Sequence, residues 1–160
     1  MNTYKPTLTA IALFLLIPLF YACGGEESSD RQTSQTEVEE AGLSDFELEH
    51  GIGPVTEPVE IGEIDPDLVT KGRNIYEMKC EMCHNYQGRM VGPELGNVVE
   101  RRSPEFIMNF ILNPSGMVRD HPVGQELLRE YMTAMPFQNV QKDEARAIVE
   151  YLRYYYEENH

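Results

Sequence analysis

Two cysteines and a histidine lie together near the middle of this 160-residue chain, in the stretch Cys80-Glu81-Met82-Cys83-His84. Two thiols three positions apart can each bond one vinyl side arm of a porphyrin, and the adjacent imidazole can then bind the porphyrin iron. The spacing therefore predicts one covalently bound haem c, attached through Cys80 and Cys83, with His84 as an axial ligand. A zinc site would need a fourth ligand and usually a second cysteine pair, and a thioredoxin-like redox pair would need a βαβ context, which the flanking sequence lacks.

The second axial ligand decides whether such a haem carries electrons or reacts with small molecules. A methionine thioether opposite histidine favours reduced iron, raises the potential and keeps oxygen and peroxide away from the iron. We expect Met135 in this position, because the following Pro136 restricts it to an extended backbone that suits a loop. Met132 is the nearest alternative, although we expect it to be helical. His121 is another, since bis-histidine ligation would lower the potential, but we expect it to be a solvated loop side chain.

The proximal imidazole also needs a partner. A metal-binding histidine usually donates its other ring N–H to an acceptor, which fixes the orientation of the ring and raises its basicity. Pro93 follows His84 by nine residues, and it can offer its carbonyl oxygen. A Gly-Pro pair such as Gly92-Pro93 is more often a plain turn, so only its place after the haem motif favours this role.

Helices are expected to position these residues. Asp65-Pro66 is a typical helix start, and apolar residues at helical spacing predict a helix from there to Cys80. Gly72 lies inside this helix, where glycine costs about 1 kcal/mol relative to alanine. Such a glycine usually marks the close approach of another backbone. We expect that backbone to be the last helix, over residues 141–158.

Two shorter helices are expected between the first and the last. The first covers residues 106–112, begins after Ser103-Pro104 and is stopped by Asn113-Pro114. The second covers residues 123–132. No segment alternates with a two-residue period, so the predicted fold class is all-α.

The N-terminal end has a different composition. Residues 8–22 form an apolar run that is short for a membrane span and follows Lys5, which predicts a signal peptide over residues 1–22. The third cysteine, Cys23, comes next, and the junction resembles a bacterial lipoprotein processing site, although Phe20 and Tyr21 are bulkier than usual. We therefore expect a lipid on Cys23; an uncleaved anchor helix is the alternative. In both cases the haem lies outside the cytoplasm, on a bacterial membrane facing the periplasm or at the cell surface.

Residues 24–62 contain eleven acidic residues and one basic residue. Such a segment cannot bury enough apolar surface, so we expect a flexible acidic tether over residues 23–64. Its later part, residues 46–64, has spaced apolar residues and could lie along the domain as an extended arm, with His50 exposed. The compact domain is expected over residues 65–160. The net charge of −14 argues against nucleic acid and against electrostatic binding to anionic lipid.

Over about residues 65–157 the chain resembles class I cytochromes c. The resemblance rests on four matches in order, namely Gly72, Tyr76 and Cys80 four residues apart, then Gly92-Pro93-Glu94-Leu95, then Thr133-Ala134-Met135-Pro136-Phe137, and finally Leu152 with Tyr155. It implies a small cytochrome c fold whose first and last helices cross at Gly72, where Leu152 and Tyr155 pack. It also implies that the Pro93 carbonyl accepts from the proximal histidine and that Met135 is the axial methionine.

These features together predict a monohaem electron-transfer lipoprotein without substrate chemistry. Its contacts with redox protein partners should be small and transient, and the acidity of the chain favours a partner with a basic docking face or one met through tethering. A haem–copper oxidase or a nitrogen-oxide reductase pathway would suit this layout. A haem enzyme such as a peroxidase would need an open sixth position and an acid–base group, and a haem-based sensor or interaction module would need a labile ligand or a signalling partner.

Overall fold

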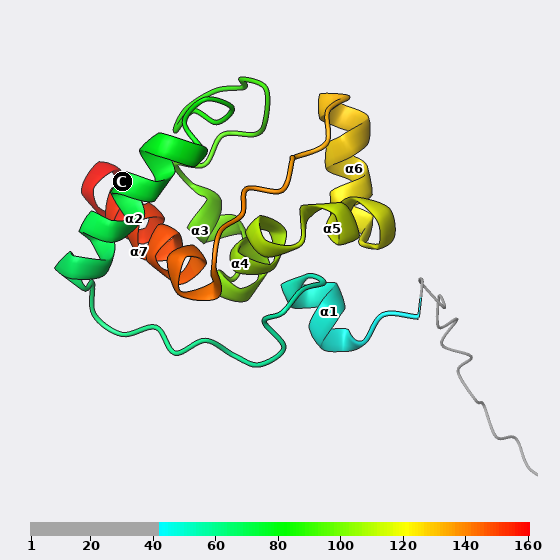
Figure 1. Ribbon diagram of the computed structural model, residues 1–160, viewed down its shortest axis with the longest axis horizontal. Helices are drawn as coiled ribbons and strands as arrows, with labels where there is room; N and C mark the ends of the chain where they lie inside the picture. The colour runs from blue at the N-terminus through cyan, green and yellow to red at the C-terminus, as the bar shows by residue number, and fades with distance from the viewer. Residues whose placement is uncertain (1–41) are drawn as a thin grey trace, which may run out of the picture. The chain divides into compact units, whose positions relative to one another are not determined.

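The computed structural model describes residues 42–160, and Figure 1 shows how their helices are arranged. The helices are α1 (Asp45–His50), α2 (Pro66–Lys79), α3 (Val98–Arg101), α4 (Pro104–Leu112), α5 (Pro114–Asp120), α6 (Pro122–Tyr131) and α7 (Lys142–Asn159). Residues 42–160 contain no strand, so the all-α prediction is confirmed. None of the described helices is long and apolar enough to span a membrane. The expected signal peptide, Cys23 and the first part of the tether lie outside the described residues.

Four of these helices begin with a proline that follows a capping side chain. The Asp65 carboxylate accepts the backbone N–H groups of Asp67 and Leu68, and α2 starts there as predicted. The predicted helices in the middle and at the end of the chain are observed as α4, α6 and α7. Asn113 ends α4 as expected, but its side chain also accepts the N–H of Gly116 and starts α5, which we did not predict.

Helices α2 and α7 cross each other, as Figure 1 shows, and Gly72 lies at their close approach. A side-chain carbon at Gly72 would overlap the carbonyl oxygen of Ala147, so the predicted close approach of the last helix is confirmed. The aromatic side chain at the crossing is Tyr151, which is buried. The expectation that Tyr155 packs there is wrong, because its ring stacks instead on Tyr86 with 4.0 Å between the ring centroids.

Residues 51–64, which we call the arm, run from α1 to α2 along the domain. Asn109 of α4, which is fully buried, donates to the carbonyl oxygens of His50, Gly51 and Val55 and accepts the Val55 N–H at 2.9 Å. Val55 is itself buried in the core, and the Val59 N–H donates to Glu105. Residues 51–64 therefore lie along the domain, as the arm alternative for residues 46–64 expected, and the flexible tether is wrong for them, because apolar burial and buried hydrogen-bond partners offset the entropy cost of ordering this segment.

His50 is the last residue of α1, and the expectation that it is exposed is wrong. Its Nδ1 lies 2.8 Å from the Ser103 hydroxyl oxygen and 3.5 Å from the Glu105 carboxylate, and only 20% of its side chain is accessible. The hydroxyl and the carboxylate both come from the start of α4, so α1 is fixed to the same helix that holds the arm.

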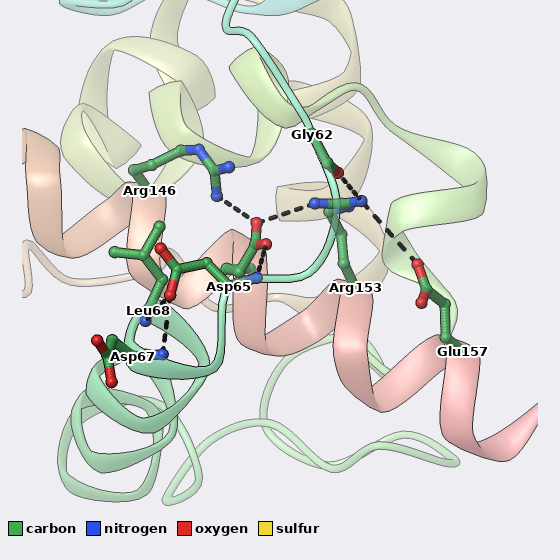
Figure 2. A network of polar contacts seen from close by, with 8 residues as sticks. Gly62, Asp65, Asp67, Leu68, Arg146, Arg153 and Glu157 are labelled. Carbon is green, nitrogen blue, oxygen red and sulfur yellow. Dashed lines mark hydrogen bonds and ion pairs between the residues drawn. The ribbon is translucent and has the colours of Figure 1, made fainter.

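The end of the arm is fixed by α7. Figure 2 shows Arg146 and Arg153 pointing towards one carboxylate. This carboxylate belongs to Glu150, and its oxygen lies 2.6 Å from Arg146 and 2.9 Å from Arg153. The same carboxylate accepts the Asp65 N–H, and Arg153 donates to the carbonyl oxygen of Gly62. Glu150 thereby links the start of α2, the end of the arm and the middle of α7.

Candidate haem-binding site

A cavity lies inside the domain, with walls from all the helices from α2 to α7 and from the segments that follow α2 and α6. Its walls are mostly apolar and include Tyr76, Val91, Leu95, Val98, Phe106, Ile107, Phe110, Ile111, Val118, Leu127, Leu128, Ile148 and Leu152. The structure brings five of the predicted site residues to this cavity, namely Cys80, Cys83, His84, Pro93 and Met135. Cys23 lies outside the described residues.

Helix α2 delivers the two cysteines to one edge of the cavity. The helix ends at Lys79, directly before Cys80, and a tight turn follows in which the N–H groups of Cys83 and His84 both donate to the Cys80 carbonyl oxygen at 3.0 Å. The two thiols are free, and Cys80 is buried. Burial raises the pKa of the Cys80 thiol to about 11, since it outweighs the opposite effect of the Lys79 charge. Cys80 is therefore a neutral thiol near pH 7, available for thioether formation.

The imidazole of His84 is held in one orientation. Its Nδ1 lies 2.8 Å from the Pro93 carbonyl oxygen, which is the contact that we predicted. A carbonyl oxygen only accepts, so Nδ1 carries the proton. Burial lowers the pKa of His84, partly offset by this hydrogen bond, so the ring is neutral and the Nε2 lone pair is left for a metal. Gly92 makes room for the ring, because a side-chain carbon there would overlap His84 Cε1.

Two tyrosines support the segment that carries the histidine, namely Tyr76, which belongs to the sequence match, and Tyr86, which the sequence did not single out. Tyr86 lies between the rings of Tyr76 and Tyr155, and its hydroxyl is 2.6 Å from the hydroxyl of Tyr151. The Tyr76 hydroxyl donates to the carbonyl oxygen of His84. Burial strongly raises the pKa of Tyr76 and of Tyr86, so both phenols stay protonated. The only sequence signal for Tyr86 is its place two residues after the haem motif.

Met135 lies on the segment that joins α6 to α7, half-buried in the cavity wall. Met132 is not helical as expected: it ends α6 in a left-handed conformation with φ of 54°, is 82% exposed and does not line the cavity. The expectation that His121 is solvated is also wrong. It is 1% exposed and away from the cavity, where one ring nitrogen accepts the Val123 N–H and the other donates to the Leu48 carbonyl oxygen. Both His121 nitrogens are thus occupied.

Within residues 42–160 no group of three or more His, Cys, Asp or Glu side chains could hold a metal ion, as the zinc alternative would require.

The model of one protein family, described as Cytochrome c, matches residues 69–155, which is more than half of the chain. The chain belongs to the cytochrome c family. Membership implies a covalently bound haem c and a haem-based electron carrier. The expected cytochrome c fold, with its N- and C-terminal helices in contact as α2 and α7, is confirmed.

Solved structures of cytochromes c are also similar. A cytochrome c from Rhodothermus marinus is 41% identical and has a TM-score of 0.68, and the match covers 72% of this chain and 100% of that one. An engineered cytochrome c from the same organism is 42% identical with a TM-score of 0.65, covering 69% and 96% of the two chains. The same engineered protein bound to a carbene intermediate has a TM-score of 0.63. No curated protein matches the chain.

The residues at the cavity fit the haem c of a cytochrome c. The site offers two free thiols three positions apart, a neutral imidazole with a free Nε2 and a thioether from Met135. The apolar walls suit the faces of a porphyrin. Arg101 and Arg102 also line the cavity, and guanidinium groups are suitable partners for its two carboxylates.

Proposed function

We propose that this cytochrome c carries one electron on a single haem attached to Cys80 and Cys83. In this proposal His84 and Met135 are the axial ligands. The observation that carries the proposal is the contact between His84 Nδ1 and the Pro93 carbonyl oxygen beside an apolar cavity that both cysteines and Met135 also line. That contact leaves Nε2 of a neutral imidazole without a hydrogen-bond partner among residues 42–160, which is the arrangement a haem iron needs.

When bound, the haem would supply the Fe(III)/Fe(II) couple, and the protein would set its potential. The Met135 thioether would fill the sixth position and keep small molecules away. The Pro93 carbonyl would raise the basicity of His84, and Arg101 and Arg102 would pair with the haem carboxylates. A peroxidase or a haem-based sensor would need the sixth position to be open or labile.

The cellular setting that we propose is a bacterial membrane, with the protein held outside the cytoplasm by a lipid on Cys23. Its partners would be membrane-associated redox proteins of a haem–copper oxidase or nitrogen-oxide reductase pathway, met transiently. The net charge of −14 favours a partner with a basic docking face. Replacing Cys23 with serine is expected to move the protein from the membrane fraction to the soluble fraction. Unchanged membrane retention would refute the lipid anchor.

The ligand assignment is tested with Met135→Ala in the haem-loaded protein, with Met132→Ala as the matched control. Met132 lies three residues away and is 82% exposed. The weak long-wavelength absorbance band of methionine-ligated ferric haem should disappear in Met135→Ala and persist in Met132→Ala. A redox titration should show a lower potential for Met135→Ala. Rapid carbon monoxide binding by the reduced wild-type protein would contradict the electron-carrier proposal.

A further inference from the structure

The segment that carries Met135, residues 133–140, has little backbone support of its own. Its residues make no backbone–backbone hydrogen bond. Gln138 donates only to the carbonyl oxygen of Pro136, within the segment. Asn139 has a positive φ of 49°, which costs energy for a non-glycine residue and persists only where the surroundings impose it. Val140 anchors the end of the segment in the core, but Met135 lies five residues earlier.

One side chain ties this segment to another helix by hydrogen bonds. The ammonium of Lys79 donates to the carbonyl oxygens of Gln138 and Asn139 at 3.0 and 3.2 Å. No other hydrogen bond joins residues 133–140 to a different element of the described chain. Hydrogen bonds from a charged donor are roughly twice as strong as those between neutral groups.

Lys79 lies where helix α2 meets the haem motif. It is the last residue of α2, directly before Cys80, and it lines the same cavity as Met135. A lysine in the last turn of a helix ordinarily interacts with the free carbonyl groups of that helix. Here its ammonium contacts carbonyl groups of the methionine segment instead.

We propose that Lys79 is a positioning residue for the sixth ligand. Its ammonium fixes the carbonyls of Gln138 and Asn139 and thereby keeps the Met135 thioether at the cavity. This inference rests on the proposed role of Met135 as an axial ligand. The helix that presents the haem-attaching cysteines would then also control how readily the opposite ligand leaves.

The test measures how well imidazole, an added ligand, displaces Met135 from the oxidised haem-loaded protein. Displacement is followed by loss of the methionine–iron absorbance band. Lys79→Leu should bind imidazole about tenfold more tightly than the wild type, because each charged hydrogen bond contributes a factor of this order. Lys79→Arg keeps the charge and the donors and should restore most of the wild-type affinity.

The matched control is Lys71→Leu. Lys71 is also on α2, but its ammonium pairs with Asp143 at the start of α7 and does not contact the methionine segment. Its affinity for imidazole should stay within about twofold of the wild type, since exposed ion pairs contribute little. An equal increase in imidazole affinity in Lys71→Leu and Lys79→Leu would overturn the proposal, because it would indicate a general destabilisation of α2.

A second measurement does not depend on the haem ligand. Phe137 is 62% exposed, so chymotrypsin can cleave after it once the segment moves away from the domain. Cleavage there should be faster in Lys79→Leu than in the wild type and the Lys71→Leu control. Unchanged imidazole affinity together with unchanged cleavage would overturn the role of Lys79.

The two proposals fail in different ways. A wild-type protein without the methionine–iron band contradicts the ligand role of Met135. In that case, faster cleavage after Phe137 in Lys79→Leu would still support the role of Lys79 in holding residues 133–140. Unchanged cleavage would overturn that role. If Lys79→Leu does not retain haem, Lys79→Ser replaces it with the same expected and overturning results.

Discussion

Glu150 is a fully buried carboxylate in the middle of α7, and its oxygens accept from three donors. The donors are the Asp65 N–H at 2.9 Å, the Arg146 guanidinium at 2.6 Å and the Arg153 guanidinium at 2.9 Å. As Figure 2 shows, Asp65 lies directly before α2 and the two arginines lie on α7, and Arg153 also contacts Gly62 at the end of the arm. Replacing Glu150 with glutamine removes the negative charge and keeps the shape of the side chain.

The size of the effect follows from this geometry. Breaking a buried ion pair by removing one partner costs about 3 to 5 kcal/mol, since the other charge is left without compensation. The side chains of Arg146 and Arg153 are 20% and 17% exposed, so water can partly solvate them, and the glutamine oxygen can still accept the Asp65 N–H. We therefore expect Glu150→Gln to lose about 3 kcal/mol of the free energy of unfolding, at the lower end of that range. The melting temperature should fall by about 10 °C.

Chemical denaturation of the haem-loaded protein at neutral pH, followed by absorbance, measures this loss. Asp143→Asn is the matched control, because it also breaks an ion pair between α7 and a basic residue, but both partners, Asp143 and Lys71, are exposed. Asp143→Asn should leave the denaturation midpoint nearly unchanged. Equal losses in the two variants, or a loss below about 1 kcal/mol in Glu150→Gln, would refute the reasoning.

The same carboxylate predicts a dependence on pH. Burial alone would raise the pKa of Glu150, but the Asp65 N–H and the two arginines outweigh it, so the folded-state pKa lies below the usual value. The carboxylate therefore stabilises the fold fully above its unfolded-state pKa and loses this contribution as the pH falls through the lower folded-state pKa. The difference in the free energy of unfolding between the wild type and Glu150→Gln should shrink in that acidic range. If this difference in free energy stayed constant down to strongly acidic pH, the lowered folded-state pKa of Glu150 would be contradicted.

Two further substitutions test how the site and the arm are held. Gly92→Ala should push the imidazole of His84 out of place and shift the reduction potential and the visible spectrum, whereas Gly62→Ala, with no atom near the added carbon, should change neither. Unaltered spectra in Gly92→Ala would mean that the ring is not confined there. Asn109→Ala removes three buried hydrogen bonds and one part-buried one to α1 and the arm and should cost about 3 kcal/mol and speed proteolysis of the arm. Asn74→Ala, exposed on α2, is its control, and equal resistance of the two variants to protease would contradict this view of the arm.

Local signals in the sequence predicted much of the fold. Asp65-Pro66 and Ser103-Pro104 mark helix starts through a capping side chain and a proline, both of which act within a few residues. Gly72 indicated a close helix crossing, since a glycine inside a helix usually marks the place where another backbone comes close. The haem motif and the methionine segment likewise indicated one cavity, because their spacing along the chain matches a known family.

The contacts that the sequence did not reveal join residues far apart in the chain. His50 is half-buried and His121 is buried because Ser103 and Leu48, each more than 50 residues away, supply their polar partners. The acidic composition of the arm suggested solvent exposure, but the amide of Asn109 satisfies its backbone groups from the inside. No periodicity in a single sequence shows such pairings, since each partner is ordinary in its own local context.

The joints between α4, α5 and α6 restrict how the length of this chain can vary. Each joint is a single residue, Asn113 or His121, that ends one helix and starts the next. Each side chain also donates a hydrogen bond to an earlier part of the chain. Asn113 donates to the carbonyl oxygen of Ile52 in the arm, and His121 donates to that of Leu48 in α1. An inserted residue would rotate the following helix by about 100° and advance it by about 1.5 Å, so it would break the cap and the N-terminal contact together. Insertions are better tolerated at the exposed turn around Gly88, where an added side-chain carbon would meet no other described atom within 4 Å.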